Sequence, residues 1–178
     1  MIKVLDLIGE FGPIILFVIT LFLLRFKATL FVYYCVGMLF KTIINSWLKV
    51  TIQQPRPIED PKLFDSVLQY HKSHHFYYQM SYDKYGMPSG HASSVFYSTM
   101  FVQLAFHDVK LTFFYFLVSL ITLFQRVSNL YHTVLQVIFG ALLGMLIGWV
   151  TFYMATQHKM GSLQLKKDDF APMFNGFL

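Results

Sequence analysis

The chain is poor in charged residues and has a single cysteine. Only 13% of its 178 residues are charged, whereas soluble domains carry about 25%. A surface that faces water on every side needs more charge than this, so the composition excludes an ordinary soluble domain. Because Cys35 is the only cysteine, neither an internal disulfide framework nor a cysteine-based metal site can form.

Acidic residues are also scarce, with 9 Asp and Glu against 14 Lys and Arg. In a chain this apolar, the positive excess is typical of loops that flank membrane spans and of an anion-binding site, so we expect no nucleic-acid partner. Asp6 and Glu10 interrupt the N-terminal region, and no small-residue cleavage site is evident there. We therefore interpret the first apolar run as a retained span and not as a signal peptide.

Long apolar runs dominate the rest of the chain, which is 56% hydrophobic and contains 20 Phe. A helix needs about 20 apolar residues to cross a bilayer. We predict an all-α, multi-pass transmembrane helical bundle of about five spans, with its active site at one membrane face. Residues 1–160 would form a single membrane-embedded domain, and 161–178 a polar C-terminal tail. The expected spans are 5–24, 28–48, 91–106, 111–125 and 133–156.

Three glycines, Gly140, Gly144 and Gly148, recur every four residues in the last span. This spacing lines one helix face with small residues, against which another helix can pack closely. Packing within one chain is the favoured interpretation, and a homodimer interface is the alternative.

The long segment 49–88 is polar and aromatic. Asp60 and Pro61 are typical of a helix start, and a short amphipathic helix on the membrane surface is expected after them. The aromatic residues beyond it suit an interfacial belt, and a substrate lid is a further hypothesis. Without cysteines or well-spaced carboxylates nearby, we favour an interfacial stretch over a metal site for His71, His74 and His75.

The distribution of cations suggests an orientation. With five spans, one side receives six Lys and Arg in short loops, including Arg25, Lys27 and Lys110. The other receives seven, of which three are assigned to chemistry below. The positive-inside rule therefore favours the first side as cytoplasmic. The chemistry would then face the lumen or the exterior.

Three polar segments, 49–57, 85–91 and 125–136, lie at span ends on that second side. A transferring phosphoryl group needs its oxygens neutralised and its attacking and leaving atoms held in line. Lys49, Arg56 and Arg126 can supply a cationic cradle. We therefore predict a site for phosphoryl transfer, with a lipid phosphate as the substrate and membrane lipids as the surroundings.

Ser89, Gly90 and His91 follow Pro88 at an expected helix start. Their backbone N–H groups would point at an anion, and Gly90 would let the backbone approach it closely. Two histidines at one face suit separate tasks, nucleophile and general acid. Gln136 follows His132 by one helical turn, so its side-chain oxygen can hold one ring nitrogen and orient the other. The arrangement requires no metal and no cofactor.

This set of residues resembles the type 2 phosphatidic acid phosphatase superfamily. The matching residues are Lys49, Arg56, Pro57, Pro88, Ser89, Gly90, His91, Arg126 and His132. The resemblance implies a helical membrane bundle and metal-independent turnover. It also implies that His132 is the nucleophile and His91 the general acid, and that five residues bind the phosphate: Lys49, Arg56, Ser89, Gly90 and Arg126.

Two residues depart from the superfamily pattern, because Gln125 replaces a Ser and Gln136 replaces an Asp. A glutamine can still orient His132, although it lacks the charge that would stabilise an imidazolium. The sequence around His132 is similar to the dolichyl diphosphate phosphatase branch, in which this glutamine is the usual residue. Gln125 has no explanation at this level.

The resemblance implies a lumen-facing hydrolase that converts dolichyl diphosphate to the monophosphate in the endoplasmic reticulum. A broader lipid phosphatase acting on phosphatidate-like substrates is one alternative. A catalytically silent membrane scaffold, motivated by the two glutamines, is another. A vanadate-dependent haloperoxidase fits poorly, because those proteins are generally soluble.

Overall fold

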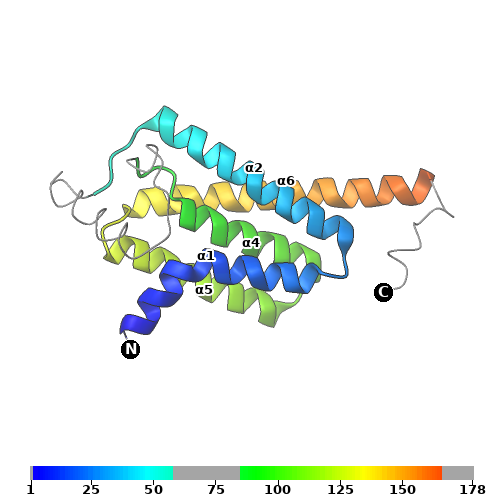
Figure 1. The fold of residues 1–178 in the computed structure, drawn as a ribbon, viewed down its shortest axis with the longest axis horizontal. Coiled ribbons are helices and arrows are strands. Elements are labelled where there is room, and N and C mark those ends of the chain that lie inside the picture. Colours follow the sequence, from blue (N-terminus) through cyan, green and yellow to red (C-terminus); the bar gives the residue numbers. More distant parts are fainter. Residues whose placement is uncertain (1, 58–84, 166–178) are drawn as a thin grey trace.

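The structure, a computed structural model, describes residues 2–57 and 85–165. Figure 1 shows a bundle of five helices in this part of the chain, so the all-α prediction is confirmed. The expected surface helix after Asp60, the three neighbouring histidines and the hypothetical lid lie outside the described residues. The helices are α1 (Ile2–Leu24), α2 (Ala28–Ile52), α4 (Gly90–Phe106), α5 (Val109–Ser128) and α6 (Val134–Leu165).

Each helix extends beyond the apolar run that predicted it. Helix α2 continues to Ile52, so Lys49 belongs to its last turn. Helix α6 continues to Leu165, past the expected start of the tail at residue 161. Four of the described helices, α1, α2, α5 and α6, are long and apolar enough to cross a membrane. Polar ends of these helices add turns without adding hydropathy, which is why the apolar pattern underestimates their length.

Helix α4 lies at the centre of the bundle and packs against α1, α2, α5 and α6. It has only 17 residues, of which nine are buried. Its buried surface combines apolar residues such as Val95 and Phe101 with small hydroxyl residues such as Ser93 and Thr99. Small residues let neighbouring helices approach, and their hydroxyls form interhelical hydrogen bonds. An example joins Thr99 Oγ1 to Ser119 Oγ of α5 at 2.9 Å.

The glycine-lined face of α6 contacts α4 of the same chain. A Cβ on Gly140 would lie 2.6 Å from the Ser89 carbonyl oxygen, and one on Gly144 would collide with the backbone of Ser93. Only glycine allows two backbones to approach so closely. This face is therefore covered within the chain, as the favoured interpretation of the spacing expects.

Helix α2 has apolar residues on its outer face and lysines on its buried face. On α2, Leu39 and Ile43 are 66% and 65% exposed, whereas Lys41 and Lys49 are 3% and 5% exposed. A soluble helix shows the reverse arrangement, because it buries its apolar stripe. Lipid is the solvent that suits this inverted pattern, and the chain is therefore a multi-pass membrane protein.

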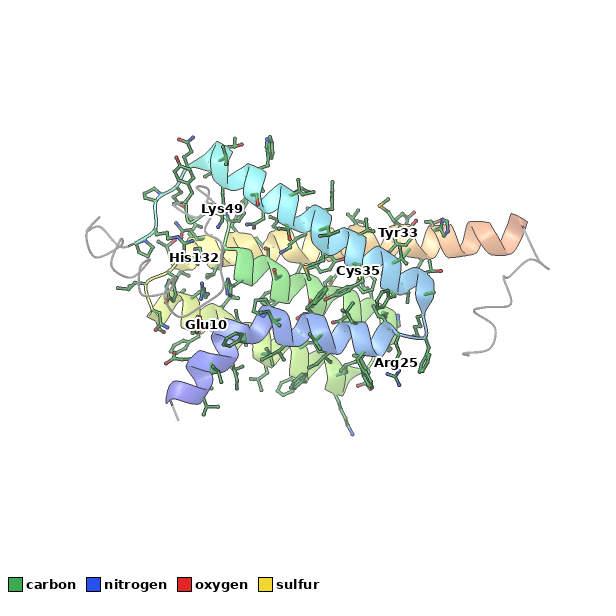
Figure 2. The ribbon with its side chains drawn as sticks, viewed as in Figure 1. Glu10, Arg25, Tyr33, Cys35, Lys49 and His132 are labelled. Carbon is green, nitrogen blue, oxygen red and sulfur yellow. The ribbon has the colours of Figure 1, made fainter. Side chains whose placement is uncertain are left out.

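The helices alternate in direction, so α2 and α5 end where α4 and α6 begin (Figure 1). Figure 2 places Lys49 and His132 toward this end of the bundle and Arg25 at the opposite end. At that opposite end, Asp108 caps α5 by accepting a hydrogen bond from the Leu111 N–H at 3.0 Å. The expected convergence of the three polar segments at one end is therefore present.

Candidate active site

The predicted site residues lie near helix termini at this end or, for Arg56, in the loop after α2. Lys49 is in the last turn of α2, and Arg126 is in the last turn of α5. His91 is the second residue of α4, and it interacts electrostatically with His132 and with the cations Lys49, Arg56 and Arg126. Three segments that are far apart in the sequence are therefore brought together around two histidines.

The start of α6 holds His132 through Gln136. The Oε1 atom of Gln136 lies 3.2 Å from His132 Nδ1, and it also accepts a hydrogen bond from the Thr133 N–H at 3.2 Å. In return, Thr133 Oγ1 accepts a hydrogen bond from the Gln136 N–H at 3.3 Å. This reciprocal pair is a capping box. The residue that fixes the helix start therefore also contacts the imidazole.

The NH₂ group of Gln136 indirectly determines which nitrogen of the His132 ring carries the proton. Its Nε2 atom donates to the Pro55 carbonyl at 2.8 Å and to Gln54 Oε1 at 3.2 Å. A backbone carbonyl can only accept, so the NH₂ group must face Pro55 and the oxygen must face His132. Nδ1 of His132 then carries the proton. When the ring is neutral, its Nε2 atom keeps a free lone pair.

These contacts account for glutamine where the superfamily pattern has aspartate. An aspartate would be one methylene shorter and would have no N–H to offer the Pro55 carbonyl. Gly86 also favours the glutamine: it donates its N–H to the Gln54 carbonyl at 2.8 Å, and a Cβ at this position would collide with the Gln136 amide. The roles of Gln54, Pro55 and Gly86 could not be predicted from the sequence beyond their positions inside two of the polar segments.

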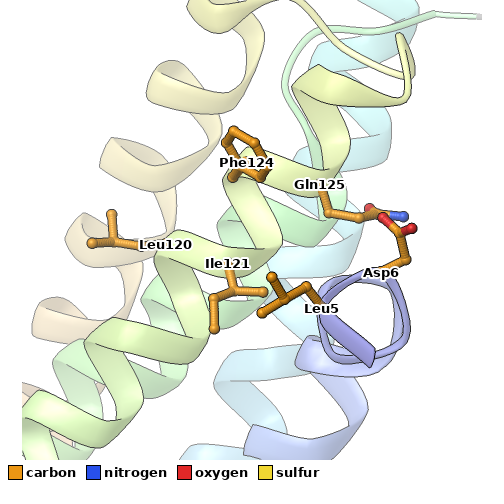
Figure 3. Close-up of a pocket in the computed structure, with 6 residues that line it drawn as sticks. All are labelled: Leu5, Asp6, Leu120, Ile121, Phe124 and Gln125. Carbon is orange, nitrogen blue, oxygen red and sulfur yellow. The ribbon is translucent and has the colours of Figure 1, made fainter. Parts of the chain in front are cut away.

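Gln125, the second departure, joins α5 to α1. Its Oε1 atom accepts a hydrogen bond from Arg126 Nη1 at 3.3 Å. Its Cβ and Cγ atoms lie so close to Gly9 that a Cβ there would collide with them. Figure 3 shows Gln125 and Asp6 at one end of an apolar cavity between the two helices. Gln125 therefore packs against α1 and also orients Arg126, for which a serine is too short.

Tyr131 anchors both arginines of the site. Arg56 donates a hydrogen bond from Nη1 to the Tyr131 carbonyl at 3.2 Å. The guanidinium of Arg126 lies over the Tyr131 ring, 4.3 Å from its centroid. The Arg126 carbonyl also accepts a hydrogen bond from the His132 N–H at 3.1 Å. The two cations are thereby held beside the histidine.

Ser89 corrects one part of the sequence prediction. It is the N-cap of α4, as expected, and its Oγ accepts a hydrogen bond from the Ala92 N–H at 3.4 Å. Its own N–H, however, donates to the Gln136 carbonyl at 3.2 Å. The prediction that this amide points at an anion is therefore wrong, because the close approach of α6 to α4 puts a carbonyl in front of it. The Ser89 hydroxyl can still donate its proton.

Gly90 differs from the glycines of α6. A Cβ on Gly90 would meet no atom closer than Asn45 Nδ2, at 3.6 Å. Helix packing therefore does not demand a glycine here. A glycine at this position would instead let a ligand approach the start of α4 closely. This explanation agrees with the predicted role of Gly90 in phosphate binding.

His132 is held in its neutral form. Burial lowers its pKa most, and the nearby Arg56, Arg126 and Lys49 lower it further, from 6.5 to about 2. The hydrogen bond with Gln136 acts in the opposite direction but is outweighed. A buried neutral imidazole among three cations suits a nucleophile that attacks an anionic phosphate.

Comparison with known proteins adds one finding to this geometry. A sequence model of the PAP2 superfamily matches residues 30–160, a range that contains every residue of the candidate site. Searches of curated proteins and of solved structures found no match.

Proposed function

The chain belongs to the PAP2 superfamily, and we propose that it hydrolyses dolichyl diphosphate to dolichyl phosphate at the lumenal face of the endoplasmic reticulum. Superfamily membership supports a lipid phosphatase activity, and the apolar helices make the chain a multi-pass membrane protein. The diphosphate substrate, the phosphohistidine route, the lack of a metal requirement and the location are the proposal. The observation that carries it is the arrangement of His132, Gln136 and the Pro55 carbonyl.

In the first step, Nε2 of His132 attacks the terminal phosphorus. The bond from that phosphorus to the bridging oxygen breaks, and its electron pair goes to the oxygen. His91, which is protonated once the anionic substrate offsets the cations around it, donates its proton to this oxygen, and dolichyl phosphate leaves. Lys49, Arg56 and Arg126 neutralise the phosphoryl oxygens throughout, which is the role that a metal ion has in other phosphatases.

In the second step, water attacks the phosphohistidine and transfers a proton to His91. The phosphorus–nitrogen bond breaks, its electron pair returns to Nε2 of His132, and orthophosphate leaves. The Nδ1 proton stays on the Gln136 side of the ring in both steps. Gln136 therefore keeps the same nitrogen available for each turnover.

The choice of substrate rests on Gln136. The sequence around His132 resembles the dolichyl diphosphate phosphatase branch, and the contacts of Gln136 with Gln54 and Pro55 show how a glutamine serves this position. Gln125 and Gln136 also motivated the alternative of a silent scaffold. Both glutamines hold polar groups of the site in place, which is compatible with activity.

The test is phosphate release by the purified chain in detergent, with EDTA present and with dolichyl diphosphate and phosphatidate as parallel substrates. His132→Ala is the matched inactive control. We expect EDTA-resistant release from dolichyl diphosphate by the wild type and none by the variant. Equal turnover of both substrates would favour the broader lipid phosphatase. If no lipid phosphate released phosphate, the catalytically silent membrane scaffold would be the favoured interpretation.

A further inference from the structure

A buried polar stripe runs along α2 from the site into the membrane. Lys49, Asn45 and Lys41 are spaced four residues apart, so they share one helix face, and all three are buried. Asn45 connects this stripe to α4: its Nδ2 donates to the Pro88 carbonyl at 3.5 Å, and its Oδ1 accepts from Ser93 Oγ at 3.3 Å. The stripe therefore lines the contact between α2 and the start of α4.

Lys41 has no part in the mechanism above. It lies two helical turns from Lys49, about 12 Å along the axis. Its Nζ donates to Ser94 Oγ at 2.6 Å, and that oxygen donates to the Gly90 carbonyl at 2.9 Å. The ammonium group is therefore connected through one side chain, Ser94, to the backbone of Gly90, a predicted phosphate-binding residue. It is also close enough to Lys49 to interact with it electrostatically.

The surroundings of Lys41 favour an anionic ligand. The residue is 3% exposed, and in the part of the chain that the structure describes its ammonium group bonds to a hydroxyl and to no carboxylate. A buried charge is costly unless it is paired, and charged groups within membrane spans are candidates for function by default. An anion supplied by the substrate would complete the coordination of this group.

A diphosphate would bring such an anion to the correct side. Its terminal phosphate must lie at His132, and its second phosphate is bonded to the lipid chain, which extends toward the hydrocarbon. Lys41 lies two helical turns deeper in the bundle than Lys49, which Figure 2 places toward the same end as His132. A lipid monophosphate has no second phosphate to place there.

We propose that Lys41, with Asn45 and Ser94, forms a second anion subsite that binds the lipid-attached phosphate of a diphosphate substrate. This inference rests on the proposed function and makes it more specific. Lys41 would act as a specificity residue, since it would stabilise the diphosphate and the monophosphate leaving group and would not touch the reacting phosphorus.

The test compares two inhibitors of the purified chain, methylenediphosphonate and orthophosphate, with dolichyl diphosphate as the substrate. We expect Lys41→Met to weaken inhibition by methylenediphosphonate about 10- to 100-fold more than inhibition by orthophosphate, the range of a lost charge-assisted hydrogen bond. The control is Thr20→Val, which removes a buried interhelical contact with Tyr115 (3.0 Å) away from the site. It should leave the ratio of the two inhibition constants unchanged.

The outcomes separate the two proposals. If the wild type releases no phosphate from dolichyl diphosphate, the proposed function fails, and the subsite fails with it. If the wild type is active but Lys41→Met shifts both inhibition constants equally, as a structural lysine would, only the subsite is overturned.

A second measurement does not depend on the folding of the variant. The wild type itself should bind methylenediphosphonate at least about tenfold more tightly than orthophosphate, because one phosphoryl group would bind the three cations near His132 and the other would bind Lys41. Equal inhibition of the wild type by both compounds would overturn the subsite even if Lys41→Met does not fold.

Discussion

The side-chain amide of Gln136 donates a hydrogen bond to the backbone carbonyl of Pro55 at 2.8 Å. This contact joins the first turn of α6 to the loop after α2, 81 residues away. Because the same amide faces His132 with its oxygen, the loop that carries Arg56 also determines which nitrogen of the histidine is free. Phosphate binding and orientation of the nucleophile therefore depend on one side chain.

Replacing Gln136 with Met should lower kcat about 10- to 100-fold with little change in KM. The variant retains the volume of the side chain but leaves Nδ1 of His132 and the Pro55 carbonyl without their partner. The measurement is steady-state hydrolysis of dolichyl diphosphate. Thr133→Val is the matched control, because it removes only the capping contact, worth about 1 kcal/mol of stability. An equal loss of kcat in this control would assign the effect to the helix start.

His132 should remain neutral between pH 8 and pH 5 in the ligand-free protein. Its pKa is lowered to about 2 by burial and the nearby cations, whereas an unperturbed histidine is mostly charged at pH 5. Histidine-selective ¹⁵N NMR in micelles, assigned with His132→Asn, would measure this. Bound orthovanadate should raise the pKa by neutralising the cations. Titration of the free ring near pH 6 would contradict the prediction.

The same shift has a consequence for stability. Below pH 6.5 an unfolded chain takes up a proton on this histidine, and the folded chain does not. The contribution of His132 to stability is therefore complete above pH 6.5 and decreases as the pH falls from there toward 2. The wild type should lose more thermal stability on acidification than His132→Asn.

Gly90→Ala and Gly144→Ala should affect different properties of the protein, phosphate binding and stability respectively. A methyl group on Gly144 would collide with the backbone of Ser93, whereas one on Gly90 would meet its nearest atom at 3.6 Å. We expect Gly144→Ala to lose about 1–3 kcal/mol of stability through overpacking. Gly90→Ala should retain its stability but bind phosphate more weakly. Thermal unfolding in detergent and inhibition by orthophosphate would separate the two effects, and a destabilised Gly90→Ala would contradict this account.

The orientation of the chain can be tested with single cysteines in a Cys35→Ser background. Asn129 is exposed at the site end of the bundle and Lys110 is exposed at the other end. In sealed microsomes, a membrane-impermeant maleimide should label Lys110→Cys at once and Asn129→Cys only after permeabilisation. The reverse pattern would place the site on the cytoplasmic side.

Apolar runs were sufficient to predict the helices, and the ends of those runs were sufficient to predict where the polar segments meet. The contact of His132 with Gln136 was also expected from their spacing, although His132 lies before the helix and the capping box of Thr133 and Gln136 brings the two side chains together. The contacts of Gln136 with Gln54 and Pro55 were not. They depend on the exact approach of two segments that are distant in the sequence, as does the engagement of the Ser89 amide by the Gln136 carbonyl.

The central position of α4 has a consequence for how the protein is made. This helix is shorter than the four that qualify as spans by length and composition, and it packs against all of them. During synthesis, the serine-rich surface of α4 is therefore shielded from lipid only after α5 and α6 have been inserted and have packed against it. His91 lies on α4, and His132 lies two residues before the start of α6. The nascent chain thus acquires both histidines in a common site only when its last helix has been inserted.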